Sequence, residues 1–325
     1  MSMTDSSTLH PGWRSSFLTT NDPDAIMVVP TGRAIGAEIL GVDLAQPVSD
    51  KLAERLRQAW AEHLVLLFRR QSLSPEALVA AAGSFGTPEE PAAARYYDGT
   101  GLTPPNQIHP NIMQISNLGP EGLPVAENDG LGSGEVVWHS DNSYKDVPPS
   151  GSMLYALEVP PQGGDTSFSN QYLAYETLPD DIRGRCLGLS AVHDASRNSA
   201  GRLRPGIVAP TTLAEVPGPI HPLVRKHPWT GRPALYLGRR RAFPSQYIPQ
   251  LAPEESEALL DDLWSHANSP ELTWSHQWTA GDVVLWDNRA AMHRREPHDP
   301  RFPRILHRVQ LAGDAVERWA PESEE

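Results

Sequence analysis

Cysteine is almost absent from this chain of 325 residues, in which Cys186 is the single one. One thiol cannot form an intramolecular disulfide, and it cannot build a zinc site that needs several cysteines. A protein without such crosslinks is suited to a reducing compartment. We therefore expect a cytoplasmic protein whose fold depends on a hydrophobic core.

Long apolar runs are absent as well. The longest, such as Leu64–Phe68, are far shorter than the roughly 20 residues that a membrane-spanning helix needs. Residues 1–20 are rich in Ser and Thr and lack the apolar stretch of a signal peptide. The sequence therefore predicts no membrane partner.

Basic residues are the minority among the charged ones, with 27 Lys and Arg against 40 Asp and Glu and a net charge of −13. An acidic surface repels nucleic acid and anionic membranes, so neither is an expected partner. However, 17 of the 27 basic residues lie between Arg183 and Arg308. This clustering allows a cationic pocket for a small anionic substrate inside an acidic molecule.

The residues that are present favour a single globular domain. Hydrophobic residues make up 39% and charged residues 21%, which is typical of a folded domain, and 32 prolines favour many loops. No linker or internal repeat divides the chain, so we expect a flexible tail at 1–24, one domain at 25–314 and an acidic tail at 315–325. Many short strands between long loops indicate a mainly β fold, a β-sandwich or jelly roll with flanking helices.

Local patterns place the individual elements. Capping residues and apolar faces predict helices at 50–62, 74–85 and 253–267, with one or two more in 170–186 broken at Pro179. Long irregular segments are expected at 86–111, 119–134 and 196–220. Alternating or apolar runs predict two strands within 26–44, a hairpin of 222–226 with 234–237, and strands at 64–68, 112–116, 152–157, 165–169, 189–194, 272–278, 283–286 and 305–311.

The motif that suggests chemistry is Trp138-His139-Ser140-Asp141. In a strand, His139 and Asp141 point to one face while Ser140 points away. An imidazole and a carboxylate side by side can occupy two adjacent positions on a metal ion. A second imidazole from elsewhere would complete a two-histidine, one-carboxylate set, which leaves the opposite face of Fe(II) open.

The second histidine is best sought late in the chain, where His293 follows an apolar strand and a turn. Arg304 and Arg308 follow, and their even spacing places both on one face of the last strand. Arginine suits a dicarboxylate ligand because its planar fork donates two charge-assisted hydrogen bonds. Thr166 is a candidate hydroxyl donor beside it. Each of these residues alone is also compatible with an ordinary structural role.

Four motifs, taken together, carry a resemblance to a known family. They are Trp138-His-Ser-Asp141, Gly163-Gly-Asp-Thr166, Trp286-Asp-Asn-Arg289 with His293, and Arg304 with His307-Arg308. The sequence resembles the taurine dioxygenase / 2,4-dichlorophenoxyacetate dioxygenase (TauD/TfdA) family from about Val28 to Gly313. Its members are Fe(II)- and 2-oxoglutarate-dependent dioxygenases on a double-stranded β-helix.

The resemblance implies a role for each matched position. His139, Asp141 and His293 would bind Fe(II), with Trp138 and Asn288 supporting them. Thr166 and Arg304 would hold the distal carboxylate of 2-oxoglutarate. Arg308 would meet an anionic group of the substrate or the near carboxylate of 2-oxoglutarate. The implied reaction consumes O2 and releases succinate and CO2, and members of the family often form dimers or tetramers, so a homo-oligomer is expected.

The substrate implied is a small anion, with a carboxylic acid of aromatic or apolar body as first choice. The segment Lys226–Arg240 resembles the aryloxyalkanoate-degrading branch, in which hydroxylation leads to C–O cleavage. The alternatives are an alkylsulfatase or sulfonate dioxygenase, a biosynthetic tailoring hydroxylase or desaturase, and, more distantly, a non-catalytic β-sandwich binding protein. Candidate substrate-pocket residues come from the long loops or their edges and are Tyr96, Tyr97, Asn117, Arg197 and Arg204.

Overall fold

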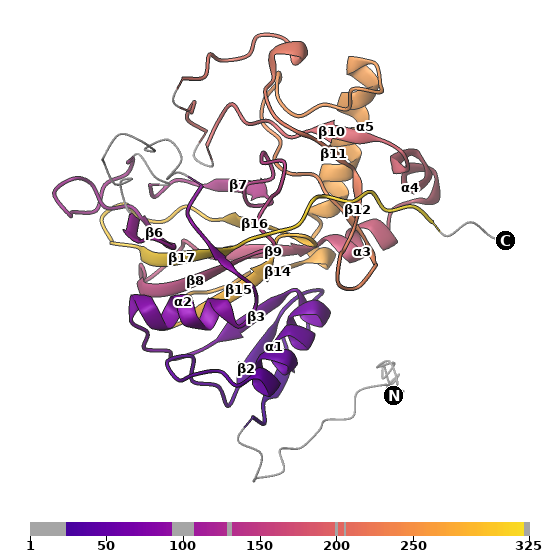
Figure 1. Cartoon of the computed structure of the whole chain (residues 1–325). Helices are drawn as coiled ribbons and strands as arrows, with labels where there is room; N and C mark the ends of the chain where they lie inside the picture. The colour runs from indigo at the N-terminus through magenta and orange to yellow at the C-terminus, as the bar shows by residue number, and fades with distance from the viewer. Residues whose placement is uncertain (1–23, 93–106, 129–131, 199–200, 205, 322–325) are drawn as a thin grey trace, which may run out of the picture.

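Two antiparallel-rich sheets form the centre of the computed structural model, which describes residues 24–92, 107–128, 132–198, 201–204 and 206–321 (Figure 1). The nine-stranded sheet has the order β1 (Met27–Pro30), β2 (Ala37–Leu40), β3 (Val65–Phe68), β15 (Val283–Asp287), β8 (Gly151–Glu158), β17 (Ile305–Leu311), β6 (Ile112–Ser116) and β5 (Gln107–His109), and β4 (Pro88–Glu89) also pairs with β17. The four-stranded sheet has the order β14 (Thr273–His276), β9 (Thr166–Asn170), β16 (Ala291–Arg295) and β7 (Val136–His139).

The two sheets pack face to face. One buried cluster combines Leu154 and Trp286 from the nine-stranded sheet with Phe168 and Ala291 from the four-stranded sheet. In β8, Leu154 faces this cluster while its neighbour Met153 belongs to the cluster on the opposite face, as strand alternation requires. This arrangement is a jelly roll, and the predicted fold class is confirmed.

Two helices cover the outer face of the large sheet. They are α1 (Asp50–His63) and α2 (Pro75–Gly83), which begin where the sequence places their caps. Ser49 accepts a hydrogen bond from the backbone N–H of Leu52, and Ser74 accepts one from Ala77, which satisfies donors that the first turn leaves unpaired. Their apolar faces pack on β3, β8 and β17.

The remaining helices and two small hairpins pack beside the four-stranded sheet, where Met292 of β16 joins their apolar cluster. In this region, β12 pairs with β13 as the predicted hairpin, and β10 pairs with β11. The elements are α3 (Gln171–Glu176), α4 (Asp180–Cys186), β10 (Ser190–Val192), η2 (Leu213–Glu215), β11 (Ile220–Pro222), β12 (Val224–Lys226), β13 (Pro233–Leu235), α5 (Pro253–Ala267) and η3 (Pro270–Leu272).

Residues of both predicted tails contact the domain. In the acidic segment after residue 314, the backbone N–H of Trp319 donates to Val224 O at 3.1 Å, and its indole packs edge-on against Tyr175. At the other end, Asp24 already belongs to the domain, since it accepts a hydrogen bond from Ser49 Oγ at 2.6 Å. The rest of the predicted N-terminal tail lies outside the described residues.

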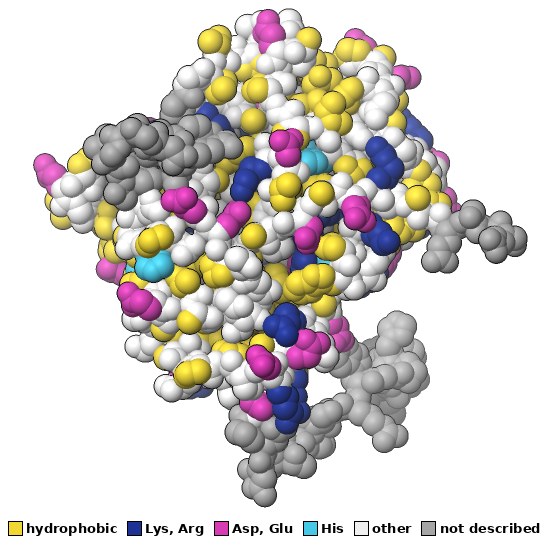
Figure 2. Space-filling view, viewed as in Figure 1, with side chains coloured by type: hydrophobic (Ala, Val, Ile, Leu, Met, Phe, Trp, Pro, Cys, Tyr) yellow, Lys and Arg dark blue, Asp and Glu magenta, His cyan; other side chains and the backbone are white. Residues whose placement is uncertain are grey.

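Charge is arranged differently on the surface and in the interior. On the face shown in Figure 2, acidic side chains are interspersed with basic ones. Several arginines are buried instead, each less than 9% exposed: Arg225, Arg239, Arg289, Arg295 and Arg304. The interior of the acidic molecule is therefore locally cationic. Among the described residues, no helix has the length and apolar character to cross a bilayer.

Candidate metal and cosubstrate site

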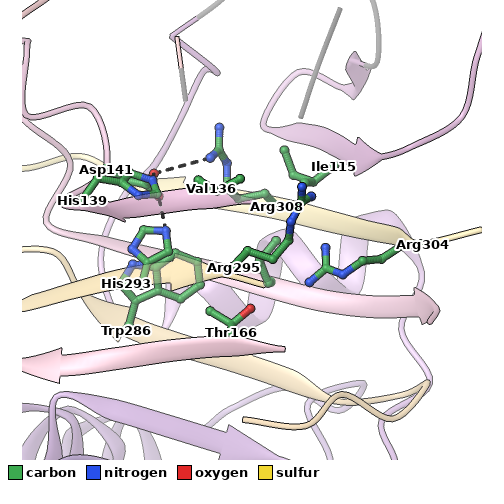
Figure 3. A pocket seen from close by; sticks show the side chains of 11 residues that line it. Ile115, Val136, His139, Asp141, Thr166, Trp286, His293, Arg295, Arg304 and Arg308 are labelled. Atoms are coloured by element: carbon green, nitrogen blue, oxygen red, sulfur yellow. Dashed lines mark ion pairs between the residues drawn. The ribbon is translucent and has the colours of Figure 1, made fainter. Parts of the chain in front are cut away.

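Three side chains that could bind one metal ion converge between the two sheets (Figure 3). His139 ends β7 and His293 lies in β16, where the two are register partners with ring centroids 4.2 Å apart. With Asp141 they offer ligand atoms that all lie within 4.8 Å of one another. The structure thus brings together the three residues that the sequence singled out.

Two local details differ from the sequence prediction. Asp141 lies in a turn beyond β7 rather than in the strand itself. The backbone of the intervening Ser140 is held by a hydrogen bond, since its N–H donates to Gly238 O at 2.9 Å. His293 lies within a strand, β16, that the sequence reading did not predict.

The two carboxylate oxygens of Asp141 have different surroundings. Oδ1 lies 3.5 Å from His139 Nε2 and 3.9 Å from His293 Nε2. Oδ2 accepts hydrogen bonds from Ser152 Oγ at 2.7 Å and from Gln310 Nε2 at 3.4 Å. Oδ1 is therefore the oxygen placed to bind a metal, while Oδ2 is held by the protein.

The protonation states of the three side chains favour the binding of a metal cation. Burial and the nearby charge of Arg239 lower the pKa of His139, and burial and His139 hold the pKa of His293 well below its ordinary value. Burial alone would raise the pKa of Asp141, but the charge of Arg308 and the hydrogen bond with His139 outweigh it and hold that pKa well below its usual range. Neutral imidazoles and an ionised carboxylate are the forms that bind metals.

Hydrogen bonds orient these ligands. His139 Nδ1 lies 2.8 Å from Val137 O, so it carries the proton and leaves Nε2 directed at the metal position. Behind Asp141, Trp286 Nε1 donates to Asn288 Oδ1 at 2.8 Å, and Asn288 Nδ2 donates to Ser152 Oγ at 3.0 Å. Asn288 therefore supports the site through Ser152. Trp138 packs instead in the cluster beside α5, outside the site.

Removing the Ser152 hydroxyl should weaken the metal site without removing a ligand. Because Asp141 Oδ2 loses its shortest hydrogen bond, we expect Ser152→Ala to lower the affinity for Fe(II) by about 10- to 100-fold. Anaerobic competition with a metal chelator measures this affinity. Ser169→Ala is the matched control, because that buried hydroxyl bonds Ala267 O. Equal affinities in wild type and Ser152→Ala would contradict the role.

Beside the three ligands, the sheets enclose a cavity whose lining includes the other predicted site residues, Thr166, Arg304 and Arg308. Arg304 precedes β17 and is 2% exposed, and its Nε has no hydrogen-bond partner among the described residues. Burial and the charge of Arg295 hold the pKa of Arg304 well below its ordinary value. A buried cation of this kind is costly unless an anion binds to it.

Trp278 links the two residues predicted to bind the distal carboxylate. Its indole Nε1 donates to Thr166 Oγ1 at 2.9 Å, and its ring lies 5.8 Å from the guanidinium carbon of Arg304. Since Thr166 accepts this bond, its own hydroxyl proton can be donated to a ligand in the cavity. The donor set therefore fits a dicarboxylate that extends from the metal position toward Arg304.

The residues predicted to line the substrate pocket lie in different surroundings in the structure. Asn117 is fully buried and does not line the cavity; its Oδ1 accepts from the N–H of Arg304 at 2.9 Å and its Nδ2 donates to Phe302 O at 3.0 Å. It fixes the backbone at Arg304 and is not a substrate contact. Arg197 donates to Gly201 O at 2.9 Å within its own loop. Tyr96 and Tyr97 lie outside the described residues.

Arg204 approaches the site from its loop. Its guanidinium carbon lies 3.8 Å from the ring centre of Tyr144, whose hydroxyl donates to Asn142 Oδ1 beside Asp141. The sequence reading missed two more buried arginines nearby. Arg239 pairs through its backbone with His139, and Arg295 lines the cavity. Neither arginine could be predicted, because β16 was not predicted as a strand and because the burial of Arg239 depends on tertiary packing.

With the geometry established, comparison with known proteins defines the family. A profile of the "Taurine catabolism dioxygenase TauD, TfdA family" matches residues 28–310, and the chain belongs to this family. It is 33% identical over 306 residues to (S)-phenoxypropionate/alpha-ketoglutarate-dioxygenase of Sphingobium herbicidovorans, covering 91% of this chain and 98% of the relative. It is 32% identical over 307 residues to pentalenolactone F synthase of Streptomyces avermitilis, covering 90% and 95%.

A solved structure gives the same result. That of AAD-2 in complex with Mn(II) and N-oxalylglycine superposes with a TM-score of 0.74 at 29% identity, covering 92% of this chain and all of the other. The protein is therefore an Fe(II)- and 2-oxoglutarate-dependent dioxygenase with a double-stranded β-helix core. The alternative of a non-catalytic binding protein is not supported, because the metal-ligand set is intact.

Proposed function

We propose that this dioxygenase hydroxylates a small carboxylic acid with an aromatic or apolar body, and that an aryloxyalkanoate is its first substrate class. The observation that carries the proposal is Arg308. Its Nη1 lies 3.6 Å from Asp141 Oδ1, and its side chain is 21% exposed at the cavity beside the metal position. A cation there can orient an anionic group next to the iron. The phenoxypropionate dioxygenase named above acts on such an acid.

The proposed roles follow the geometry. His139, Asp141 and His293 hold Fe(II), and Thr166 and Arg304 hold the distal carboxylate of 2-oxoglutarate. When bound, iron and 2-oxoglutarate supply the oxidising power, with one oxygen atom of O2 entering the substrate and the other entering succinate as CO2 leaves. The sheets exclude water around these groups, and the buried arginines neutralise the carboxylates.

The outcome for an aryloxy acid follows from the carbon that is oxidised. Hydroxylation at the carbon that bears the ether oxygen gives an unstable hemiketal or hemiacetal. Its C–O bond breaks, so that a phenol leaves and the acid fragment keeps the new oxygen as a carbonyl. A panel of aryloxy acids, alkyl sulfates and amino acids, read by succinate release, tests the substrate class. Turnover confined to alkyl sulfates or amino acids would overturn the first choice.

A biosynthetic tailoring oxidation is the second candidate function. It is favoured by the identity of 32% to pentalenolactone F synthase, which is close to the identity with the phenoxypropionate enzyme. An apolar polycyclic acid added to the substrate panel separates the two candidates. Cytoplasmic location and assembly into a dimer or tetramer stay predictions from the sequence, and light scattering of the purified protein tests the assembly.

Arg308→Ala should affect the organic acid more than 2-oxoglutarate. A hydrogen bond to a charged group contributes about 1.5–3 kcal/mol, so we expect KM for the acid to rise by about 10- to 100-fold. The KM for 2-oxoglutarate should change by less than about threefold. Steady-state kinetics with each ligand varied in turn measures both values. Equal increases would place Arg308 at the near carboxylate of 2-oxoglutarate instead.

A further inference from the structure

The cavity beside the metal position contains a third arginine that the proposed roles do not use. Arg295 lies two residues beyond His293 in β16, so both side chains point to the same face of the strand. It is 6% exposed and lines the cavity together with Thr166, Arg304 and Arg308 (Figure 3). Because Arg295 lies between the sheets, it is not a surface cation, as most arginines are.

Arg295 is adjacent to the predicted carboxylate-binding residues. In the β9–β16 pair, Arg295 is the register partner of Thr166, so their side chains stand next to each other on one face. Arg295 also interacts electrostatically with Arg304. Burial is the main cause that lowers the pKa of Arg304, and the charge of Arg295 is the second. Thr166, Arg295 and Arg304 therefore surround one end of the cavity.

This end of the cavity holds two neighbouring buried cations. A guanidinium group stays protonated in proteins, so Arg295 is a second cation beside Arg304 in the lining of the cavity. Two like charges in a poorly solvated space destabilise each other, and a carboxylate placed between them relieves that repulsion. A carboxylate can accept about four hydrogen bonds, enough for a hydroxyl and two guanidinium groups.

The guanidinium of Arg295 is also held in place. Its Nη2 donates to Gly134 O, in the segment that leads into β7. A guanidinium has five N–H donors, so this bond is compatible with a further contact to a ligand. Side chains that are fixed before binding lose little conformational entropy when the ligand arrives.

We propose that Arg295 is a specificity-determining residue of this enzyme that binds the distal carboxylate of 2-oxoglutarate together with Arg304 and Thr166. Its second positive charge makes the pocket select a 2-oxo acid with a distal carboxylate over one that lacks it. The proposal rests on the proposed assignment of Arg304 and Thr166 to that carboxylate.

Two ligands that differ only at the distal end test this role. 2-Oxovalerate has the five carbons of 2-oxoglutarate, with a methyl group in place of the distal carboxylate. Anaerobic calorimetric titration of the Fe(II)-loaded enzyme with each acid measures binding without turnover. We expect Arg295→Met, which keeps the apolar stem, to weaken 2-oxoglutarate by at least about tenfold and to change 2-oxovalerate by less than about twofold. Arg295→Lys should retain part of the preference.

Arg294→Met is the matched control. It removes the same charge one residue earlier on β16, but the Arg294 side chain points away from the cavity, where it is 35% exposed near Glu296. We expect it to leave the binding of both acids unchanged. If Arg295→Met does not fold, judged by thermal unfolding, the Arg295→Lys variant gives the same comparison of the two acids.

The possible results distinguish the role of Arg295 from the cosubstrate assignment of Arg304 and Thr166 on which it rests. Equal weakening of both acids, or no weakening of either, would overturn the role of Arg295. The same titrations with Arg304→Ala test the cosubstrate assignment itself. If Arg304→Ala keeps the wild-type preference for 2-oxoglutarate over 2-oxovalerate, that assignment fails. If only the Arg295 variants keep the preference, the assignment stands and the role of Arg295 fails.

Discussion

Asp141→Ala is expected to abolish Fe(II)-dependent turnover and to reduce Fe(II) binding to the level of a protein with no site. Asp141 supplies the anionic ligand, with Oδ1 at 3.5 Å from His139 Nε2 and 3.9 Å from His293 Nε2. Without it, two neutral imidazoles remain beside the positive charge of Arg308, which repels a divalent cation. Chelator competition and succinate release measure the two losses.

Asp146→Ala is the control for that experiment. It removes a carboxylate five residues later from an exposed position, and we expect it to leave Fe(II) binding unchanged. Asp141→Ala should still fold, which the far-ultraviolet circular dichroism spectrum checks. Turnover near the wild-type level in Asp141→Ala would remove this residue from the metal site.

Arg304→Ala should produce the second large effect, a loss of affinity for 2-oxoglutarate of about 100-fold or more. A bidentate pair between arginine and a carboxylate makes two charge-assisted hydrogen bonds, each of which contributes about 1.5–3 kcal/mol. Removing the guanidinium also leaves the distal carboxylate in a poorly solvated space. Anaerobic binding of 2-oxoglutarate to the Fe(II) enzyme measures the change directly.

The stability of the same variant distinguishes a binding residue from a structural one. Within the described part of the chain, no salt bridge joins Arg304 to a carboxylate, and its Nε has no hydrogen-bond partner. Its removal therefore relieves an uncompensated burial, and we expect the ligand-free variant to unfold at the same or a higher temperature. Arg301→Ala, whose side chain is 81% exposed, should change neither affinity nor stability. An unchanged affinity in Arg304→Ala would show that the cosubstrate assignment is wrong.

Local signals explain why much of the fold could be predicted. The helix α5 has the predicted bounds because Pro253 starts it and a repeated apolar face covers its length. The last strand, β17, also has the predicted bounds, and it contains the β-branched residues Ile305 and Val309, which favour a strand. By contrast, β16 was missed because Ala291–Arg295 contains no β-branched or aromatic residue. Pairing with β7 and β9 makes it a strand.

The site was predictable only in part, for physical reasons. The spacing of His139 and Asp141 is local, whereas the approach of His293 depends on pairing between β7 and β16 and was inferred from the family resemblance. Burial of arginine is a tertiary property that no local pattern reveals. Arg239 and Arg295 were therefore not predicted. Asn117 was misjudged for the same reason, because only the fold shows that it bonds the backbone of Arg304.

Anaerobic titration of the purified protein with Fe(II), first without and then with 2-oxoglutarate, tests the central claim most directly. Three protein ligands on one face of a ferrous ion predict one Fe(II) per chain and a weak visible charge-transfer band that appears only when 2-oxoglutarate is added. The band should be absent in Asp141→Ala. A wild-type protein that binds no Fe(II), or that gives the same spectrum with and without 2-oxoglutarate, would contradict the claim.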